Sequence, residues 1–404
     1  MTGTTIDHLV ALTIFLAAIL LFIAFFNQTI QTVITYQRHS NLATKCSDTL
    51  DDILLSPGIP LYWGQTSTIP KGFGLQDPEF TQYRLSPFSL MRLNSSVGTP
   101  VFYSRTGQYY SNTTTGFGQS LLVPYSQIID SKTATDLMGI TGSYGFSLTV
   151  TPVLTLAISE KQVNPLNVEI KVTGSGYPLA DSDVTYCFIK NIETSQYPSY
   201  MIECNATTTD NQGTAYLNLG TFDPTRESYA LIAYACASGL VGVGSHQHSS
   251  YTDNYPIPLV SDFDSSTILL AHSQDIVNSS TPSQISYNAT FLILAQDFTL
   301  REMPLDNATE RIGAVDPGTS RTITIQTNNP GILVVSYMKS DSGDRSGIVL
   351  MPWGTGSLAF PTTFGNDPHQ QDWVTTDIRQ VTVGKVAYQV KLLLWSFESQ
   401  QVVS

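Results

Sequence analysis

An apolar run near the start of the chain constrains the fold more than any other feature. From Leu9 to Phe26 every residue except Thr13 is apolar. At a rise of 1.5 Å per residue, these 18 residues make a helix roughly 27 Å long, which matches the hydrocarbon core of a bilayer. The sequence therefore predicts a membrane-spanning helix.

The flanks of this run favour a retained span over a cleaved secretion signal. A signal peptide has an apolar core of about 7–15 residues that follows a basic segment. Here no Lys or Arg comes before Leu9, and the residues after Phe26, Asn27-Gln28-Thr29, do not form a small-x-small cleavage site. We expect the segment to stay in the membrane, with lipid as its first partner.

The helix is expected to continue beyond the bilayer. No Gly or Pro occurs between Thr4 and Ser56, and Ser56-Pro57-Gly58 is a strong helix end. Apolar residues recur at helix-like spacing through the second half of the stretch: Ile30, Val33, Ile34, Leu42, Leu50, Ile53 and Leu54. Two arrangements fit this pattern. One is a single helix of roughly 50 residues, and the other is a membrane helix, a kink and a separate amphipathic helix packed on the next domain.

Asp7 is the only carboxylate from Thr4 up to Arg38, and no Lys or Arg occurs in that stretch before Arg38. A carboxylate near the hydrocarbon core is costly unless it is paired or close to the interface. Asp7 is near enough to the helix start to reach the lipid headgroups, where the helix dipole favours an anion by about 0.3–1 kcal/mol. Alternatively, Asp7 pairs with the terminal amine of a neighbouring subunit inside a helical bundle.

The segment "TTID", followed by an unbroken apolar helix and a polar-faced continuation, resembles the archaeal type IV pilin-like proteins over residues 1–55. The resemblance implies that Gly3 precedes a processing site, that Thr4 becomes the new N-terminus, and that Asp7 is the acid near the start of the helix. It also implies association with like subunits through the N-terminal helix.

Composition and sequons together indicate which side of the membrane holds the rest of the chain. Charged residues make up 13% of the chain, about half the usual share, and the net charge is −13. Because no basic footprint is present, nucleic acid is excluded as a partner. Arg38 and Lys45 alone would place their side in the cytoplasm, but large domains translocate regardless of a few charges. Six Asn-x-Ser/Thr sequons beyond the expected long helix favour an extracytoplasmic glycoprotein: Asn94, Asn112, Asn205, Asn278, Asn288 and Asn307.

The expected fold class is mainly β: a long transmembrane helix over residues 1–56, a small α+β region over 57–153, and two β-sandwich (Ig-like) domains over 154–252 and 253–404. In the α+β region, Ile128, Ile129, Ala134 and Leu137 suggest a short helix closed by Gly139. Alternation at Phe146, Leu148 and Val150 predicts a strand that ends at Pro152.

The next segment carries a second resemblance. "GYPLADSDVTY", then "TTTDNQGTAYLNLG", then "YALIAYA" are similar to bacterial Ig-like and transthyretin-like (carboxypeptidase regulatory-like) modules over about residues 154–250. Such modules are spacers, stalks, or units that contact carbohydrate or protein. Beyond a linker-like stretch at 251–258, β-type runs separated by Asn-Pro-Gly and Asp-Ser-Gly turns predict the second sandwich.

The chain has four cysteines, with neither a CxxC pair nor zinc-ligand spacing. Four cysteines allow three connectivities, and Cys187–Cys204 is preferred because these residues flank an expected hairpin. Such a bridge closes a loop of roughly 17 residues and contributes about 3 kcal/mol in the chain-entropy model. Cys236 could replace either partner, and Cys46 is free or intermolecular. The alternative is that all four are small buried apolar residues.

Few residues suggest chemistry. His246 and His248 share one face of an expected strand and are weak candidates for a metal site, with Asp253 as a further ligand. Asp341-Ser342-Gly343-Asp344 resembles half a calcium loop but lacks the downstream Glu. Asp262 and Asp264 also alternate on one face, as expected of a solvated linker. No nucleophile elbow, metalloprotease or phosphate-loop motif occurs, and no cofactor or metal is expected.

Three functions remain open. The first is a non-catalytic, single-pass surface protein, pilin-like at its N-terminus, that serves as a filament subunit or an adhesion module. The second is a monomeric membrane-anchored Ig-like protein that binds a ligand or belongs to the cell envelope without polymerising. The third is an enzyme carried on β-sandwiches. The first is preferred, with like subunits and surface carbohydrate or protein as expected partners.

Overall fold

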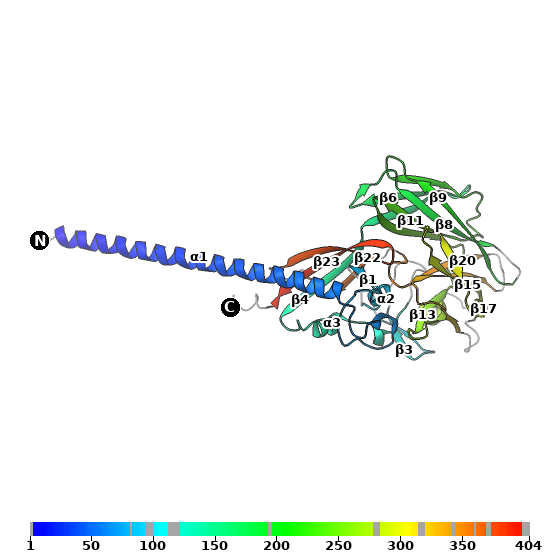
Figure 1. The fold of residues 1–404 in the computed structure, drawn as a ribbon, viewed down its shortest axis with the longest axis horizontal. Coiled ribbons are helices and arrows are strands. Elements are labelled where there is room, and N and C mark those ends of the chain that lie inside the picture. The colour runs from blue at the N-terminus through cyan, green and yellow to red at the C-terminus, as the bar shows by residue number, and fades with distance from the viewer. Residues whose placement is uncertain are drawn as a thin grey trace.

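The computed structural model describes residues 3–80, 83–93, 100–111, 122–192, 196–277, 283–313, 320–340, 345–358, 361–368 and 373–397. Its architecture is mainly β with one long N-terminal apolar helix, as the sequence predicts. Figure 1 shows this helix projecting from one end of a β-rich head, with the C-terminal strands returning to the point where the helix enters.

A single helix, α1 (Gly3–Leu55), runs from the apolar segment into the head, so the arrangement with two separate helices is not observed. Its inner end packs on the head through residues at spacings of three and four: Leu42, Cys46, Thr49, Leu50, Ile53 and Leu54. Pro57 cannot continue the helix, and Gly58 takes a φ of +81°, which glycine adopts without strain.

The sheet under α1 has the strand order β1-β22-β23-β4-β21. Its strands are β1 (Arg84–Leu85), β4 (Tyr144–Pro152), β21 (Thr362–Gly365), β22 (Thr375–Val383) and β23 (Val386–Ser396). All neighbours are antiparallel except β1, which is parallel to β22. The expected segments 57–153 and 253–404 therefore both contribute to this sheet. Alternation within β22 and β23 predicts strands, but it carries no information on the distant strand with which they pair.

Two sheets enclose the core of the middle sandwich, whose strands lie within the expected 154–252. One sheet holds β5 (Leu154–Gln162), β6 (Asn167–Gly174), β7 (Tyr177–Pro178) and β10 (Thr214–Asn218). The other has the order β12-β11-β8-β9, with β8 (Asp183–Ile192), β9 (Ser199–Thr208), β11 (Tyr229–Ala237) and β12 (Leu240–His248). The core between them includes Ile170, Phe188 and Leu231.

The second sandwich pairs a three-stranded with a five-stranded sheet. The first contains β13 (Pro256–Asp262), β14 (Thr267–His272) and β18 (Arg321–Thr324). The second contains β15 (Ile285–Leu294), β16 (Leu300–Met303), β17 (Thr309–Ile312), β19 (Gly331–Lys339) and β20 (Ser346–Trp353). A hairpin of β2 (Val101–Tyr103) and β3 (Gln108–Tyr110) packs Tyr103 and Tyr110 on β13 and β14. Part of the expected 57–153 region thus belongs to this sandwich.

Short helices occupy the connections. They are α2 (Pro87–Met91), α3 (Ser131–Leu137), α4 (Ser273–Val277), η1 (Trp63–Gln65) and η2 (Tyr125–Gln127). Helix α3 begins later than expected because Asp130 caps it, with its Oδ1 accepting a hydrogen bond from the Thr133 amide at 2.7 Å. Ile128 and Ile129 therefore precede the helix, while Gly139 follows it with a φ of +66°.

The two sandwiches are joined by a buried polar seam as well as by apolar contacts. Asn191 donates from Nδ2 to the Gly347 carbonyl at 3.0 Å, and its Oδ1 accepts a hydrogen bond from Ser336. Ser228 donates to the Ser346 carbonyl at 2.7 Å. These side chains are buried, so an unmatched partner would cost the desolvation of a polar group, about 1–3 kcal/mol. The seam favours one fixed relation between the sandwiches.

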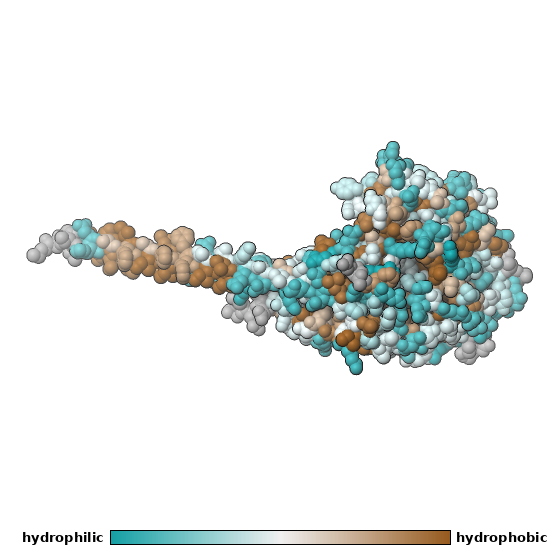
Figure 2. Space-filling model, viewed as in Figure 1, coloured by the Kyte–Doolittle hydropathy of each residue, from teal (hydrophilic) through white to brown (hydrophobic). Residues whose placement is uncertain are grey.

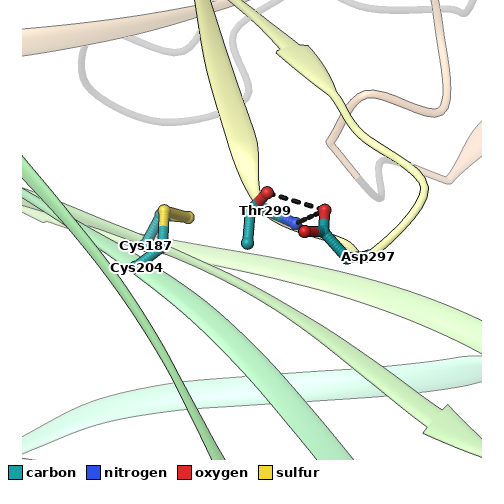
Figure 3. Close-up of a disulfide and its surroundings, with 4 residues drawn as sticks. All are labelled: Cys187, Cys204, Asp297 and Thr299. Atoms are coloured by element: carbon teal, nitrogen blue, oxygen red, sulfur yellow. Dashed lines mark hydrogen bonds between the residues drawn. A yellow bond between two sulfur atoms is a disulfide. The ribbon is translucent and has the colours of Figure 1, made fainter.

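A disulfide joins Cys187 on β8 to Cys204 on β9, which are directly opposite each other in the ladder. Figure 3 shows it beside the turn between β15 and β16, where Asp297 Oδ1 accepts a hydrogen bond from the Thr299 hydroxyl at 2.7 Å. Cys46 is a buried free thiol, and Cys236 is a partly buried one. The disulfide thus lies where the middle sandwich meets the second one.

Candidate functional site

One helix within the described residues is long and apolar enough to cross a bilayer, and its apolar window has no buried residue. Figure 2 shows apolar surface gathered on the outer part of α1, away from the head. Thr13, which interrupts the apolar run, donates its hydroxyl to the Leu9 carbonyl at 2.8 Å. This bond satisfies the hydroxyl within the helix, as a lipid environment requires. Gly3 and Thr4 lie in the first turn of α1, and Asp7 follows with an exposed side chain.

Beyond the apolar run, a further stretch of α1 precedes the part of the helix that is buried in the head. From Phe26 to Leu42, the first buried position, the helix rises by about 24 Å. Three apolar side chains here lie on one face and are exposed: Ile30 (41%), Val33 (58%) and Ile34 (44%). We call these three residues the α1 stripe. Its spacing of i, i+3 and i+4 is that of a helix-packing face, yet the described residues provide no partner for it.

Polar contacts fix the angle at which α1 leaves the head. Arg379 on β22 lies 3.2 Å from Asp51 on α1, measured from Nε to Oδ1, and its Nη2 donates to Ser47 at 2.9 Å. The same guanidinium lies 2.6 Å from Asp377. At the outer edge of the head, the His39 ring meets Trp373 edge-on, with centroids 4.2 Å apart. The direction of α1 is therefore set by the head.

His246 and His248 do face a common acid, but it is Glu160 on β5 rather than Asp253. Glu160 Oε1 lies 3.6 Å from His246 Nε2 and 3.3 Å from His248 Nδ1, and it accepts the Tyr229 hydroxyl at 2.6 Å. Burial, together with this hydrogen bond and the nearby charge, raises the pKa of Tyr229 well above its usual value. In the described part of the chain, no three His, Cys, Asp or Glu side chains are grouped as a metal site.

The four residues close one edge of the middle sandwich. His248 Nε2 lies 3.1 Å from the Pro224 carbonyl, which can only accept, so this nitrogen carries the proton. A second proton on Nδ1 turns the contact with Glu160 into an ion pair. Farther along the same face of β12, Gly242 and Gly244 lie against Leu154 and Leu156 of β5. Along this face of β12, His246 and His248 therefore occupy the end near Glu160. At the other end, β5 lies so close that only glycine fits.

Arg92 is a buried cation that the sequence analysis did not identify. Its Nε donates to the Gln127 carbonyl at 2.9 Å, and its Nη1 and Nη2 donate to the carbonyls of Thr66 and Thr68 at 2.7 and 2.9 Å. The Trp63 carbonyl is a fourth acceptor. Burial lowers the pKa of Arg92 to about 10, which leaves it charged at neutral pH. No sequence motif signals this role, because the acceptors are main-chain groups.

The acidic turns expected in the second sandwich have ordinary structural roles. Asp262, at the end of β13, accepts hydrogen bonds from the hydroxyls of Ser67 and Ser265, both at 2.8 Å. These bonds lower the pKa of its carboxyl group. Asp264 also faces this loop, where its Oδ2 accepts from the Ser67 amide at 3.4 Å. Asp341-Ser342-Gly343-Asp344 lies outside the described residues.

The sequons differ in how well they could present a glycan. Asn205 is exposed on the edge strand β9, and Asn307 is exposed in a turn with a φ of +58°. Asn288 lies in the middle of β15, partly buried between β17 and β19. Asn94, Asn112 and Asn278 lie outside the described residues. Space for a glycan is therefore clear at Asn205 and Asn307.

Comparison with known proteins gives no family. No family model matches the chain, and no curated protein matches it. Among solved structures, a Salmonella alpha-2-macroglobulin is 9% identical over 56% of this chain and 17% of its own, with a TM-score of 0.21. Red sea bream transglutaminase is 9% identical over 61% of this chain and 37% of its own, with a TM-score of 0.18. The chain thus spans well under half of either protein, and similarity this low supports no conclusion about function.

Proposed function

We propose that this chain is a non-catalytic membrane-anchored surface protein, pilin-like at its N-terminus, whose head lies outside the cytoplasm and whose α1 associates with like subunits. The observation that carries the proposal is the α1 stripe. It lies beyond the length that one bilayer covers, and the packing of the head on α1 begins several residues later, at His39 and Leu42.

The physical argument concerns the stability of a bare helix. In water, helices take most of their stability from packing an amphipathic face, and short isolated segments are marginal. Between Phe26 and Arg38 the apolar side chains of α1 are exposed, so among the described residues this stretch has no such packing. A second α1 with the same stripe would cover Ile30, Val33 and Ile34 and leave the polar face in water. Packing at this level would also bring neighbouring Asp7 side chains and N-termini close together, which agrees with the second interpretation of Asp7.

The matching experiment compares two polar variants of the full chain in a mild detergent. The triple change Ile30→Gln, Val33→Gln and Ile34→Gln should convert an oligomer into a monomer, as measured by analytical ultracentrifugation. Thr32→Gln is the control, because Thr32 is exposed roughly 150° around the helix from the centre of the α1 stripe and should leave assembly unchanged. A wild-type chain that is monomeric over the whole concentration range would favour the monomeric anchor instead.

A further inference from the structure

A groove crosses the junction of the head sheet and the two sandwiches. Two adjoining cavities of about 400 and 280 Å³ share four lining residues: Arg84, Asn329, Pro330 and Gly384. Because these residues line both cavities, the cavities are direct neighbours, and we call the pair the Arg84 groove. Ligand sites are found preferentially at such junctions, and their usual volumes are about 300–1,000 Å³.

Arg84 stands at the centre of this groove with part of its guanidinium unused. Its Nε lies 3.4 Å from Asp77 Oδ2, and its Cζ lies 3.4 Å from the centroid of the Phe80 ring. The ion pair and the ring hold the guanidinium in place. Among the described residues no acceptor reaches Nη1 or Nη2. Arginine carries five N–H donors, so this one retains donors for a ligand in the groove.

The charges that line the groove cancel. Asp77 and Glu79 are acidic, whereas Arg84 and Lys385 are basic. Lys385 is already engaged, since its Nζ donates to the Ala295 carbonyl at 2.6 Å. A polyanion would meet two carboxylates, and a polycation would meet the guanidinium. The electrostatics therefore select a neutral ligand.

The remaining lining residues suit a neutral molecule that has both hydroxyl groups and apolar faces. Gln65, Asn328 and Asn329 supply amide donors and acceptors along the wall of the larger cavity. Tyr62 and Phe80 place exposed rings at its rim, and they are 46% and 41% exposed. A sugar ring matches this pattern, because it offers C–H faces to an aromatic ring and hydroxyls to planar polar side chains.

We propose that the Arg84 groove binds a neutral oligosaccharide, with Tyr62 stacking on a sugar ring and with Arg84 and the amides of Gln65, Asn328 and Asn329 bonding to its hydroxyls. This inference goes beyond the proposed assembly. It requires only that the head be exposed to glycans, and it does not require that α1 associate with a second copy.

The test uses the full chain in phospholipid nanodiscs, which avoids sugar-based detergents, and titrates it by calorimetry with mannohexaose, maltohexaose and cellohexaose. At least one hexamer should bind the wild type. Tyr62→Ala and Arg84→Gln should each weaken that binding at least tenfold. Tyr109→Ala is the matched control, because Tyr109 is a 57% exposed tyrosine on β3 outside the groove, and it should bind as the wild type does.

Three results would overturn the proposal. One is the absence of binding to all three hexamers at millimolar concentration, and another is equal loss in Tyr62→Ala and Tyr109→Ala. The third is stronger binding of polygalacturonate or a proline-rich peptide than of any neutral hexamer. Unfolding midpoints of each variant show whether Arg84→Gln acts through folding, in which case Tyr62→Ala decides. The variant with three substitutions in the α1 stripe should still bind the sugar, so failure of assembly and failure of glycan binding are separable.

Discussion

Arg92→Met is expected to destabilise the full chain by about 3–5 kcal/mol, because several buried carbonyls lose their donor at a cost of about 1–3 kcal/mol each. The side chain is fully buried and donates to four main-chain carbonyls, those of Trp63, Thr66, Thr68 and Gln127. Methionine fills much of the space but donates nothing, so these acceptors lose the bonds that replaced water. Urea unfolding followed by tryptophan fluorescence measures the loss.

Two further variants make this result specific. Arg92→Lys keeps the charge but offers a single ammonium in place of the planar fork, so it should fall between the wild type and Arg92→Met. Arg301→Met removes an exposed arginine on β16 and should change the free energy of unfolding by less than about 0.5 kcal/mol. Equal stability of Arg92→Met and Arg301→Met would show that the Arg92 contacts do not hold the loop at 63–68.

Gly242→Val is expected to destabilise the middle sandwich by about 3 kcal/mol, at the upper end of the usual cost of overpacking. A Cβ built on Gly242 would lie 2.6 Å from Leu154 Cβ and 2.9 Å from the Leu154 carbonyl oxygen. One of these atoms is main chain, so β5 and β12 would have to separate rather than let a side chain rotate away. The free energy of unfolding from urea titration checks the size of the effect.

Ser245→Val is the matched control for this prediction. It adds the same side chain to the same strand, but on the opposite face, where alternation points it away from β5. Valine is favoured in strands, so this variant should be as stable as the wild type or slightly more so. If Gly242→Val is no less stable than Ser245→Val, the close approach of β5 and β12 is not what requires glycine.

What the sequence predicts well here is local. The length of α1 follows from the absence of Gly and Pro between Thr4 and Ser56 and from apolar spacing through Leu54. The middle sandwich follows from alternation and turn residues. The contacts that build the candidate sites, by contrast, join residues that lie far apart in the sequence. Glu160 precedes His246 by 86 residues, and β23 pairs with β4 across more than 200 residues. No periodicity within either segment encodes such a pairing.

The same limit explains why the sequence does not mark Arg92 and Arg84 as important residues. Each is a single basic residue in a loop-rich stretch, with nothing around it in the sequence to mark it. The importance of Arg92 comes from main-chain carbonyls gathered by folding. That of Arg84 comes from a groove whose walls are supplied by segments near residues 80, 330 and 384. Features assembled from main chain and from distant loops have no local pattern that an unaided sequence could display.

The most direct test of the account is cross-linking through the α1 stripe in the full chain, reconstituted in liposomes. In a Cys236→Ser background, which leaves Cys46 buried, Val33→Cys should give covalent dimers with a short bis-maleimide, because position 33 faces a second α1. Thr32→Cys, which is exposed on the side of the helix opposite the α1 stripe, should stay monomeric under the same conditions. If Val33→Cys gives no dimer, or if both positions cross-link equally, the proposed association through α1 is contradicted.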